Sequence, residues 1–456
     1  MEQACADLPF RADLIGAGKS YLTITFGCQA NEFDTEVFAG MLESAGYRRA
    51  AGPGDADLIL LNTCSVRQKP EDKVAGMLGR LRKLKEEREG LTIVVAGCMA
   101  QRPSAAADLA RRFPFLDLIV GTHALPRFPQ LLEQAGRSRR PLIDIAAENE
   151  GREGLPVVRS SSFKAWLPVI HGCNNFCSYC IVPHVRGRER SRPFAEIVEE
   201  ARSLEESGYL EITLLGQNVN SYGHDLAEGE RADFAALLEA LDRLEGKARI
   251  RFMTSHPKDL SPRLIEMMGR GKKICEHLHL PAQAGSNRIL EGMNRSYTRE
   301  RYLGLVGALK KEVPGIALTT DLMVGFPGET EADFQETLAL LDEAEFDHAY
   351  TFIYSPRPGT RAAEMEEQLS FAEKNERLQR LASRQNEISL RLNRALLGQT
   401  FELLVEGRSK NNPEMFSGRT RTNKLVHFAA AEELSGKLVA VEITEAFTWY
   451  LAGERV

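Results

Sequence analysis

The chain has 456 residues, of which 43% are hydrophobic and 27% charged, and its net charge is -6 at pH 7. A chain of this length is too long to fold around one hydrophobic core of ordinary size, so we expect two or three domains. The composition excludes a disordered or fibrous chain. The negative charge argues against a surface that is basic throughout, so any nucleic-acid site must be a local patch. No apolar run is long enough to span a membrane and the first residues lack a signal-peptide pattern, so we expect a cytoplasmic protein without a membrane partner.

The first domain is expected over residues 19–136, as a parallel α/β sheet of the flavodoxin or Rossmann-like type. Runs such as YLTITFGC and LTIVVAGC alternate with amphipathic helical patterns such as NEFDTEVFAGMLESAGY. Three successive strand patterns each end in a cysteine, namely Cys28, Cys64 and Cys98. One such cysteine is more often a small buried residue. Because the carboxyl ends of parallel strands share one sheet edge, where ligands bind, we expect these three to converge on a common site.

Three further regions follow the first domain. Residues 137–160, which include AENEGREGLPVVRSSS, are expected to be a linker. Residues 161–390 contain six strand patterns, mostly separated by helical ones, which predicts an open partial (β/α)6 barrel with its chemistry at the carboxyl ends of the strands. A helix is expected from Ser370 to Leu397. Residues 394–456 alternate with period two, typical of a small all-β domain.

The segment HGCNNFCSYCIVPHVRGRERSRP carries Cys173, Cys177 and Cys180 and then arginines at every second residue. Disulfides are rare in the cytoplasm, so metal ligation is the better interpretation of these thiols. Zinc would require a fourth ligand, for which His171 and His184 are available. A [4Fe–4S] cluster held by three thiolates instead leaves one iron open to an exogenous ligand. The position of the loop, after the first barrel strand, favours the cluster.

The C-x-x-x-C-x-x-C spacing, with Tyr179 before the last cysteine, resembles the motif of the radical S-adenosylmethionine (SAM) superfamily. The resemblance implies a [4Fe–4S] cluster on the three cysteines, SAM on its open iron, and a 5′-deoxyadenosyl radical that abstracts hydrogen from carbon. It also implies a partial barrel. Candidate SAM contacts are Tyr179, Gln217 in LLGQNVN, and Val324 and Gly325 in DLMVGFPGET, where Asp321 replaces a glycine common in the superfamily.

Over almost its whole length the chain resembles the radical SAM methylthiotransferases, and among them those that modify tRNA. The stretches that carry this resemblance include TFGCQANEFDTE, LNTCSVRQKPEDKV, AGCMAQR and GRTRTNKLVHF. It implies a second [4Fe–4S] cluster on Cys28, Cys64 and Cys98, where the sulfur to be inserted is thought to sit. One SAM would methylate this sulfur and another would supply the radical. The product would carry a methylthio group on carbon 2 of an isopentenyl-modified adenosine beside the tRNA anticodon, with no catalytic residue beyond the two clusters.

The same resemblance implies partners. The C-terminal residues resemble a TRAM domain, an RNA-binding β-barrel, and five basic residues there are candidate tRNA contacts: Arg408, Lys410, Arg419, Arg421 and Lys424. A reductant such as flavodoxin or ferredoxin, together with iron–sulfur assembly and sulfur-donor proteins, would serve the clusters. The arginines after the cysteine loop are either RNA contacts or partners of acidic neighbours; they are Arg186, Arg188, Arg190 and Arg192.

Two alternative functions remain open at this point. One is methylthiolation of a threonylcarbamoyl-modified adenosine in tRNA, or of an aspartate in a ribosomal protein, although GCQAN and NTCSVR favour the isopentenyl substrate. The other is a zinc-bound, noncatalytic RNA-binding protein. Cys5 and Cys275 lie outside both cysteine sets, and we predict that both are dispensable.

Overall fold

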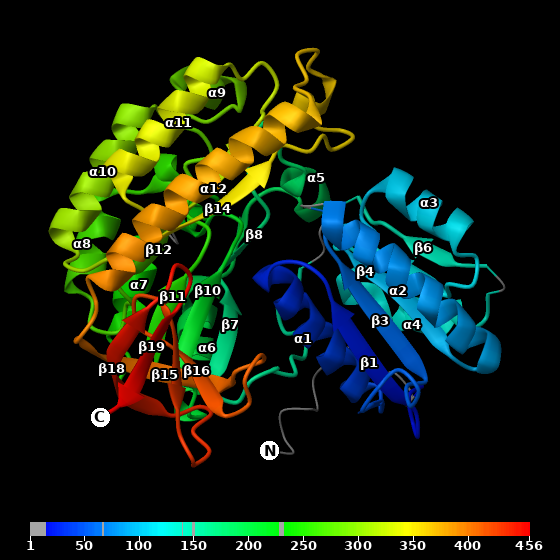
Figure 1. The fold of residues 1–456 in the computed structure, drawn as a ribbon. Coiled ribbons are helices and arrows are strands. Elements are labelled where there is room, and N and C mark those ends of the chain that lie inside the picture. The colour runs from blue at the N-terminus through cyan, green and yellow to red at the C-terminus, as the bar shows by residue number, and fades with distance from the viewer. Residues whose placement is uncertain (1–14, 66–67, 139, 148–150, 228–231) are drawn as a thin grey trace. The chain divides into compact units, whose positions relative to one another are not determined.

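The computed structural model describes residues 15–65, 68–138, 140–147, 151–227 and 232–456 (Figure 1). Cys5 lies outside these residues. The chain divides into two compact units, of which the first comprises the residues up to Ser160 together with 172–174 and 180–188, and the second comprises the rest. None of the described helices is both long enough and apolar enough to cross a membrane.

The first unit contains the expected parallel α/β sheet. Its six strands follow the order β2-β1-β3-β4-β5-β6, and every pairing is parallel. The strands are β1 (Ser20–Thr25), β2 (Arg48–Arg49), β3 (Leu58–Thr63), β4 (Thr92–Gly97), β5 (Leu118–Val120) and β6 (Leu142–Asp144). The helices are α1 (Gln29–Ser44), α2 (Gln68–Glu87), α3 (Pro103–Arg112) and α4 (Phe128–Ala135).

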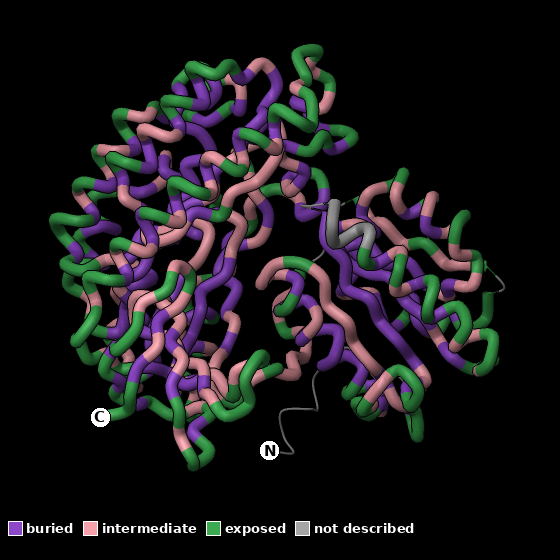
Figure 2. Tube along the Cα trace, in the orientation of Figure 1, coloured by how far each residue is buried: buried purple, intermediate pink, exposed green. Residues whose placement is uncertain are grey.

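Helices cover the sheet on both faces. Apolar residues of α2 and α3, such as Leu78 and Leu109, pack against Ile59 and Ile93 on one face. Helices α1 and α4 pack together on the other face, where the rings of Phe38 and Phe128 are 4.9 Å apart (Figure 1). Every residue of β3 is buried (Figure 2). This two-sided burial explains why the strands are continuous apolar runs rather than alternating ones.

The stretch 137–160 differs from the linker expected there. Its residues 142–144 form the edge strand β6, which pairs with β5. Farther along, Val158 N donates to Glu36 O at 3.0 Å, and a Cβ on Gly40 would lie 2.2 Å from Pro156 O, so this part packs closely on α1. The polar composition of this stretch therefore did not reveal the backbone hydrogen bonds that hold β6 and Val158 against the first unit.

The second unit contains the expected six-stranded partial barrel. Two parallel three-stranded sheets, β11-β10-β7 and β12-β13-β14, are linked by a bridge between Ile250 and Ile274. The strands are β7 (Lys164–Pro168), β10 (Glu211–Leu215), β11 (Arg249–Phe252), β12 (His277–His279), β13 (Ala317–Val324) and β14 (His348–Ile353). The helices among them include α6 (Phe194–Glu206), α7 (Phe234–Asp242), α8 (Pro262–Arg270), α10 (Arg299–Glu312) and α11 (Glu331–Ala344).

The C-terminal part of this unit consists of a long helix and a small barrel. Helix α12 (Phe371–Arg394) begins at a capping box between Ser370 and Glu373, and it contacts β14. The closed barrel has the strand order β15-β16-β17-β19-β18 and its own apolar core. Its strands are β15 (Thr400–Arg408), β16 (Met415–Arg419), β17 (Leu425–Ala429), β18 (Leu438–Ala446) and β19 (Leu451–Arg455).

Candidate active site

The three strand-end cysteines of the first unit follow neighbouring parallel strands, as expected. Cys28, Cys64 and Cys98 come after β1, β3 and β4, whose register aligns Thr25 with Asn62 and Thr63 with Gly97. Two glycines allow the close approach of these strand ends. Gly27 and Gly97 have φ values of 137° and 98°, and a Cβ on Gly27 would lie 2.8 Å from the Cβ of Cys64.

The side chain of Asn31 connects the three strand ends. Its Oδ1 lies 3.8 Å from the sulfurs of both Cys28 and Cys98, so those two cysteines converge on one amide. Its Nδ2 donates to Thr63 O, beside Cys64, at 2.9 Å. Asn31 is fully buried in the first turn of α1. No sequence pattern indicates a role for this residue, because an asparagine after a strand is ordinarily a helix or turn residue.

A charged group lies beside the same cysteines. Arg186 Nη2 donates to Asn31 Oδ1 and to Asp34 Oδ2, each at 2.8 Å, and Arg152 donates to Asp34 Oδ1 at 2.5 Å. The Arg186 guanidinium also lies beside the Cys98 sulfur. Burial raises the pKa of the Cys98 thiol, and Arg186 opposes that effect. Cys98 is therefore buried, with the Asn31 amide oxygen and one permanent cation beside its sulfur.

Arg186 belongs to the segment that follows the second cysteine motif. Helix α5 (Val182–Arg186) begins two residues after Cys180, and its Val185, with Ile181, packs against Cys98 within the first unit. Thr122 Oγ1 donates to the carbonyl of Val185. In the same unit, Cys173 N donates to Gly187 O at 3.1 Å. The segment 180–188 is thus part of the cysteine environment of the first unit.

Cys177 lies in the second unit, where the loop after α9 (Asn287–Gly292) holds it. Arg295 Nη1 donates to the Cys177 sulfur at 3.4 Å. Ser178 N donates to Met293 O at 3.0 Å, and Asn294 Nδ2 donates to Phe176 O at 3.0 Å. Arg295 is 8% exposed, and it also donates to Pro281 O. The segment MNRS carries no recognised motif, so sequence reasoning missed this support for the cysteine loop.

The carboxyl ends of the barrel strands present buried polar atoms that have no hydrogen-bond partner among the described residues. These atoms are Asn220 Oδ1 and Nδ2 after β10, Ser255 Oγ and His256 Nε2 after β11, and the Tyr354 hydroxyl after β14. Burial, together with Arg295, lowers the pKa of His256 to about 2, so this imidazole is neutral at physiological pH. A buried polar atom without a hydrogen-bond partner destabilises the fold. A cluster of such atoms at one sheet edge is therefore suited to bind a polar ligand that pairs with them.

The candidate SAM contacts lie at this same edge. Gln217 follows β10 and is partly buried, and Val324 ends β13 with its side chain fully buried. The backbone N–H of Gly325 donates to Glu329 Oε1 at 3.0 Å. Tyr179 packs against the barrel core. Their roles in binding SAM stay predictions.

Three comparisons with known proteins bear on this arrangement. The chain matches the model described as "Radical SAM superfamily" over residues 167–341 and the TRAM domain over residues 394–456. Residues 20–121 match the model described as "Uncharacterized protein family UPF0004".

Curated relatives match nearly the whole chain. A tRNA-2-methylthio-N(6)-dimethylallyladenosine synthase of Moorella thermoacetica is 52% identical over 445 residues, covering 97% of this chain and 100% of the relative. One of Desulforamulus reducens is 52% identical over 439 residues, covering 96% of each chain. The chain belongs to the tRNA-2-methylthio-N(6)-dimethylallyladenosine synthase family.

Among solved structures, the radical SAM methyltransferase TsrM from Kitasatospora setae resembles the fold of this synthase-family chain. The TM-score is 0.53 at 16% identity, with 76% of this chain and 75% of TsrM covered. For a synthase-family chain with a radical SAM domain, a [4Fe–4S] cluster and SAM are the cofactors. The Cys177 thiol that receives an arginine hydrogen bond, and the unpartnered polar atoms at the strand ends, fit these two groups.

Two of the basic residues expected to contact RNA instead form ion pairs within the second unit. Arg421 donates to both carboxylate oxygens of Glu276, and Lys424 donates to Asp347 Oδ1 at 2.5 Å. Glu276 and Asp347 directly precede β12 and β14. The C-terminal barrel of this synthase-family chain therefore contacts the amino ends of the strands, whereas Cys177 and the unpartnered polar atoms lie at the carboxyl ends.

The other basic residues of the C-terminal barrel are more accessible. Arg419 lies 3.4 Å from Glu406 and donates to Asn423 O. Arg408 stacks over Phe416 and lies 3.8 Å from Glu433, and Lys410 is exposed. All five RNA contacts stay predictions, and Arg408 and Lys410 are the two with the greatest exposure.

The arginines after the cysteine loop differ from one another. Arg186 and Arg192 are ion-paired, the latter with Glu200 at 2.9 Å. Arg188 and Arg190 are exposed. The alternating pattern thus combines side chains that pair inside the protein with side chains that face solvent.

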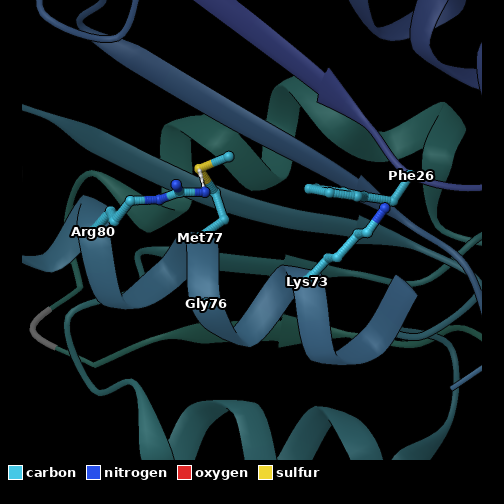
Figure 3. Close-up of a pocket in the computed structure, with 5 residues that line it drawn as sticks. All are labelled: Phe26, Lys73, Gly76, Met77 and Arg80. Atoms are coloured by element: carbon cyan, nitrogen blue, oxygen red, sulfur yellow. Dashed lines mark hydrogen bonds between the residues drawn. The ribbon is translucent and has the colours of Figure 1, made fainter. Parts of the chain in front are cut away.

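A pocket of about 470 Å³ lies beside Phe26, just after β1 (Figure 3). Lys73, Gly76, Met77 and Arg80 of α2 line it, and Arg80 Nη2 donates to the Met77 sulfur at 3.6 Å. The lining therefore combines one aromatic ring with two cationic side chains.

Proposed function

We propose that this chain methylthiolates carbon 2 of N6-dimethylallyladenosine beside the anticodon of tRNA. The observation that carries the proposal is the 52% identity to synthases of that name over 97% of the chain. Those names favour the isopentenyl substrate over a threonylcarbamoyl-modified adenosine or a ribosomal-protein aspartate. A single-stranded anticodon loop suits the chemistry because its bases are exposed at little unstacking cost.

The proposal includes two [4Fe–4S] clusters with three cysteine ligands each. Cys173, Cys177 and Cys180 would hold the cluster that binds and cleaves SAM, and their spacing within eight positions supports this assignment. Cys28, Cys64 and Cys98 would hold the second. When bound, these groups supply the radical that removes hydrogen from carbon 2 and the sulfur that, once methylated by a second SAM, replaces it.

The donor chemistry of the first-unit set supports a cluster. Three cysteines follow adjacent strand ends, and a cationic side chain lies beside them. Among the described residues, no group of three His, Cys, Asp or Glu side chains is arranged to hold a single metal ion. In a cluster each thiolate binds a different iron, so the sulfurs need not share one ion.

The chain's own residues would bind and orient the substrates. Arg295 would hold the Cys177 thiolate, and Asn220, Ser255, His256 and Tyr354 would supply hydrogen bonds to SAM at the carboxyl edge. Arg408, Lys410 and the cations of the Phe26 pocket would contact tRNA phosphates. A cytoplasmic location, a flavodoxin- or ferredoxin-type reductant, and iron–sulfur assembly and sulfur-donor proteins complete the proposal.

The test is mass spectrometry of tRNA nucleosides from cells that lack the gene. We expect 2-methylthio-N6-dimethylallyladenosine to disappear, N6-dimethylallyladenosine to accumulate, and the wild-type gene to restore the product. A matched pair of variants sharpens the test, because Cys275→Ala should restore the product and Cys64→Ala should not. Unchanged product in the deletion strain would refute the substrate assignment.

A further inference from the structure

Arg186 is fixed in place inside the first unit. Its side chain is 6% exposed, and one nitrogen donates both to Asn31 and to Asp34 at 2.8 Å. Asn31 accepts this bond through the same oxygen that lies 3.8 Å from the Cys28 and Cys98 sulfurs. The guanidinium is planar and always charged, so this geometry presents a permanent positive charge to both sulfurs.

The charges around Asp34 leave this cation only partly neutralised. Arg152 and Arg186 each bind one oxygen of the Asp34 carboxylate, and all three side chains are buried. One carboxylate therefore serves two guanidinium groups. A buried charge is costly unless an opposite charge lies nearby. The Asn31 oxygen to which this guanidinium donates lies 3.8 Å from both the Cys28 and the Cys98 sulfurs.

We propose that Arg186 is a positioning residue that raises the reduction potential of the cluster held by Cys28, Cys64 and Cys98. The inference rests on the proposed function, because it requires that cluster. Cysteines bind iron as thiolates, and the potential of an iron–sulfur cluster depends on net charge and on hydrogen bonds to its sulfurs. A cation beside the ligand sulfurs stabilises the more negative, reduced state.

The experiment isolates this cluster in the full-length chain. Cys173, Cys177 and Cys180 are each replaced by alanine, so that only the first-unit cysteines can hold a cluster. The protein is reconstituted anaerobically with iron and sulfide, its iron content is measured, and the midpoint potential is obtained by redox titration monitored by electron paramagnetic resonance.

Arg186→Met in this background should make the midpoint potential more negative. We expect the ratio of reduced to oxidised cluster at a fixed potential to fall at least tenfold, which is 59 mV for a one-electron couple. Arg186→Lys should recover most of the shift because it retains the charge. Asp34→Asn should move the potential in the opposite direction, because it removes the carboxylate that offsets Arg186.

Arg159→Met is the matched control. Arg159 lies 3.4 Å from Glu36 in the same unit, and its variant should leave the potential unchanged. An unshifted potential in Arg186→Met, or a shift of the same sign in Asp34→Asn, would overturn the inference. Failure of the parent protein to bind iron would instead refute the proposed cluster itself, and with it the inference, so the two failures are distinguishable.

Discussion

The two cysteine sets arise by different routes. Cys173, Cys177 and Cys180 fall within eight positions, whereas Cys28, Cys64 and Cys98 are each separated by more than thirty residues. The first set is a property of one loop, and the second is a property of the register of β1, β3 and β4. A local motif can thus be recognised from spacing alone, whereas a distributed site becomes visible only when the strands are placed in a sheet.

Each set nevertheless includes a cysteine that lies beside a buried arginine distant in sequence. Arg295 donates to Cys177 from 118 positions along the chain, and Arg186 lies beside Cys98 from 88 positions along the chain. Neither arginine belongs to a cysteine motif of its own set. The comparison therefore indicates that the two sites share a local chemistry despite their different origins.

The largest expected effect comes from the local set. Cys177→Ala should abolish both SAM cleavage and methylthiolation, because the radical cannot form without its cluster. Anaerobic assays that measure 5′-deoxyadenosine and the modified nucleoside test this. Cleavage at the wild-type rate in this variant would break the assignment of the motif.

Loss of one member of the distributed set should separate the two activities. Cys64→Ala should retain some SAM cleavage and lose sulfur insertion, because the loop motif is intact. The same pair of assays gives the readout, and iron analysis should fall from roughly eight to roughly four irons per chain for two cubanes reduced to one. Normal methylthiolation by Cys64→Ala would disprove the role of the strand-end cysteines.

The arginine of the local set should have an intermediate effect. Arg295→Met removes the donor to Cys177, and loss of such a supporting contact typically costs about 10- to 100-fold in metal affinity or activity. We expect SAM cleavage to fall within that range while the iron bound by the first-unit cysteines is unchanged. Circular dichroism checks that the variant is folded. An unchanged cleavage rate would remove Arg295 from the comparison.

Substitutions of basic residues in the C-terminal barrel should have smaller effects, of two kinds: some should weaken tRNA binding and others should lower stability. Lys410→Ala should weaken tRNA binding and reduce the salt dependence of its affinity by about one phosphate contact. Lys424→Ala should instead lower the free energy of unfolding by about 1 to 3 kcal/mol, because it leaves Asp347 without a partly buried ion-pair partner. Filter binding over a salt series measures the tRNA affinity of each variant, and urea unfolding measures its stability. If both variants changed tRNA affinity and stability in the same way, the distinction between RNA-contacting and structural charges would be contradicted.

The smallest effect should come from the buried cysteine outside both sets. Cys275 is 2% exposed, and burial raises the pKa of its thiol. Cys275→Ala should keep full iron content and activity, at a stability cost of about 1 kcal/mol for the small cavity. Loss of iron in this variant would show that the division of the cysteines into two sets is incomplete.

The sequence predicted the architecture of both units well, because the spacing of apolar residues indicates which faces of each strand and helix are buried. The six strands of the partial barrel, the strand-end cysteines and the polar ends after β11 at Ser255 and His256 all follow from such patterns. Their common physical basis is that strand ends and buried faces are set by neighbours in sequence.

Side-chain partners could not be predicted in the same way. Counting charges in residues 408–424 does not reveal that Glu276 and Asp347 face Arg421 and Lys424. Nor does an alternating row of arginines reveal that α5 turns Arg186 inward toward Asp34. These pairings depend on contacts between segments that lie far apart in the chain. The same is true of residues 137–160, which pair with β5 and α1 where a linker was expected.

The placement of α5 has a consequence for how this enzyme can be divided. The first unit becomes complete only when residues 172–174 and 180–188 join the N-terminal 160. A fragment cut at residue 136 or 160 would lose Ile181 and Val185 from the surface of Cys98, as well as the guanidinium beside it. A chimera that exchanges this domain between relatives would therefore need to exchange the cysteine loop with it.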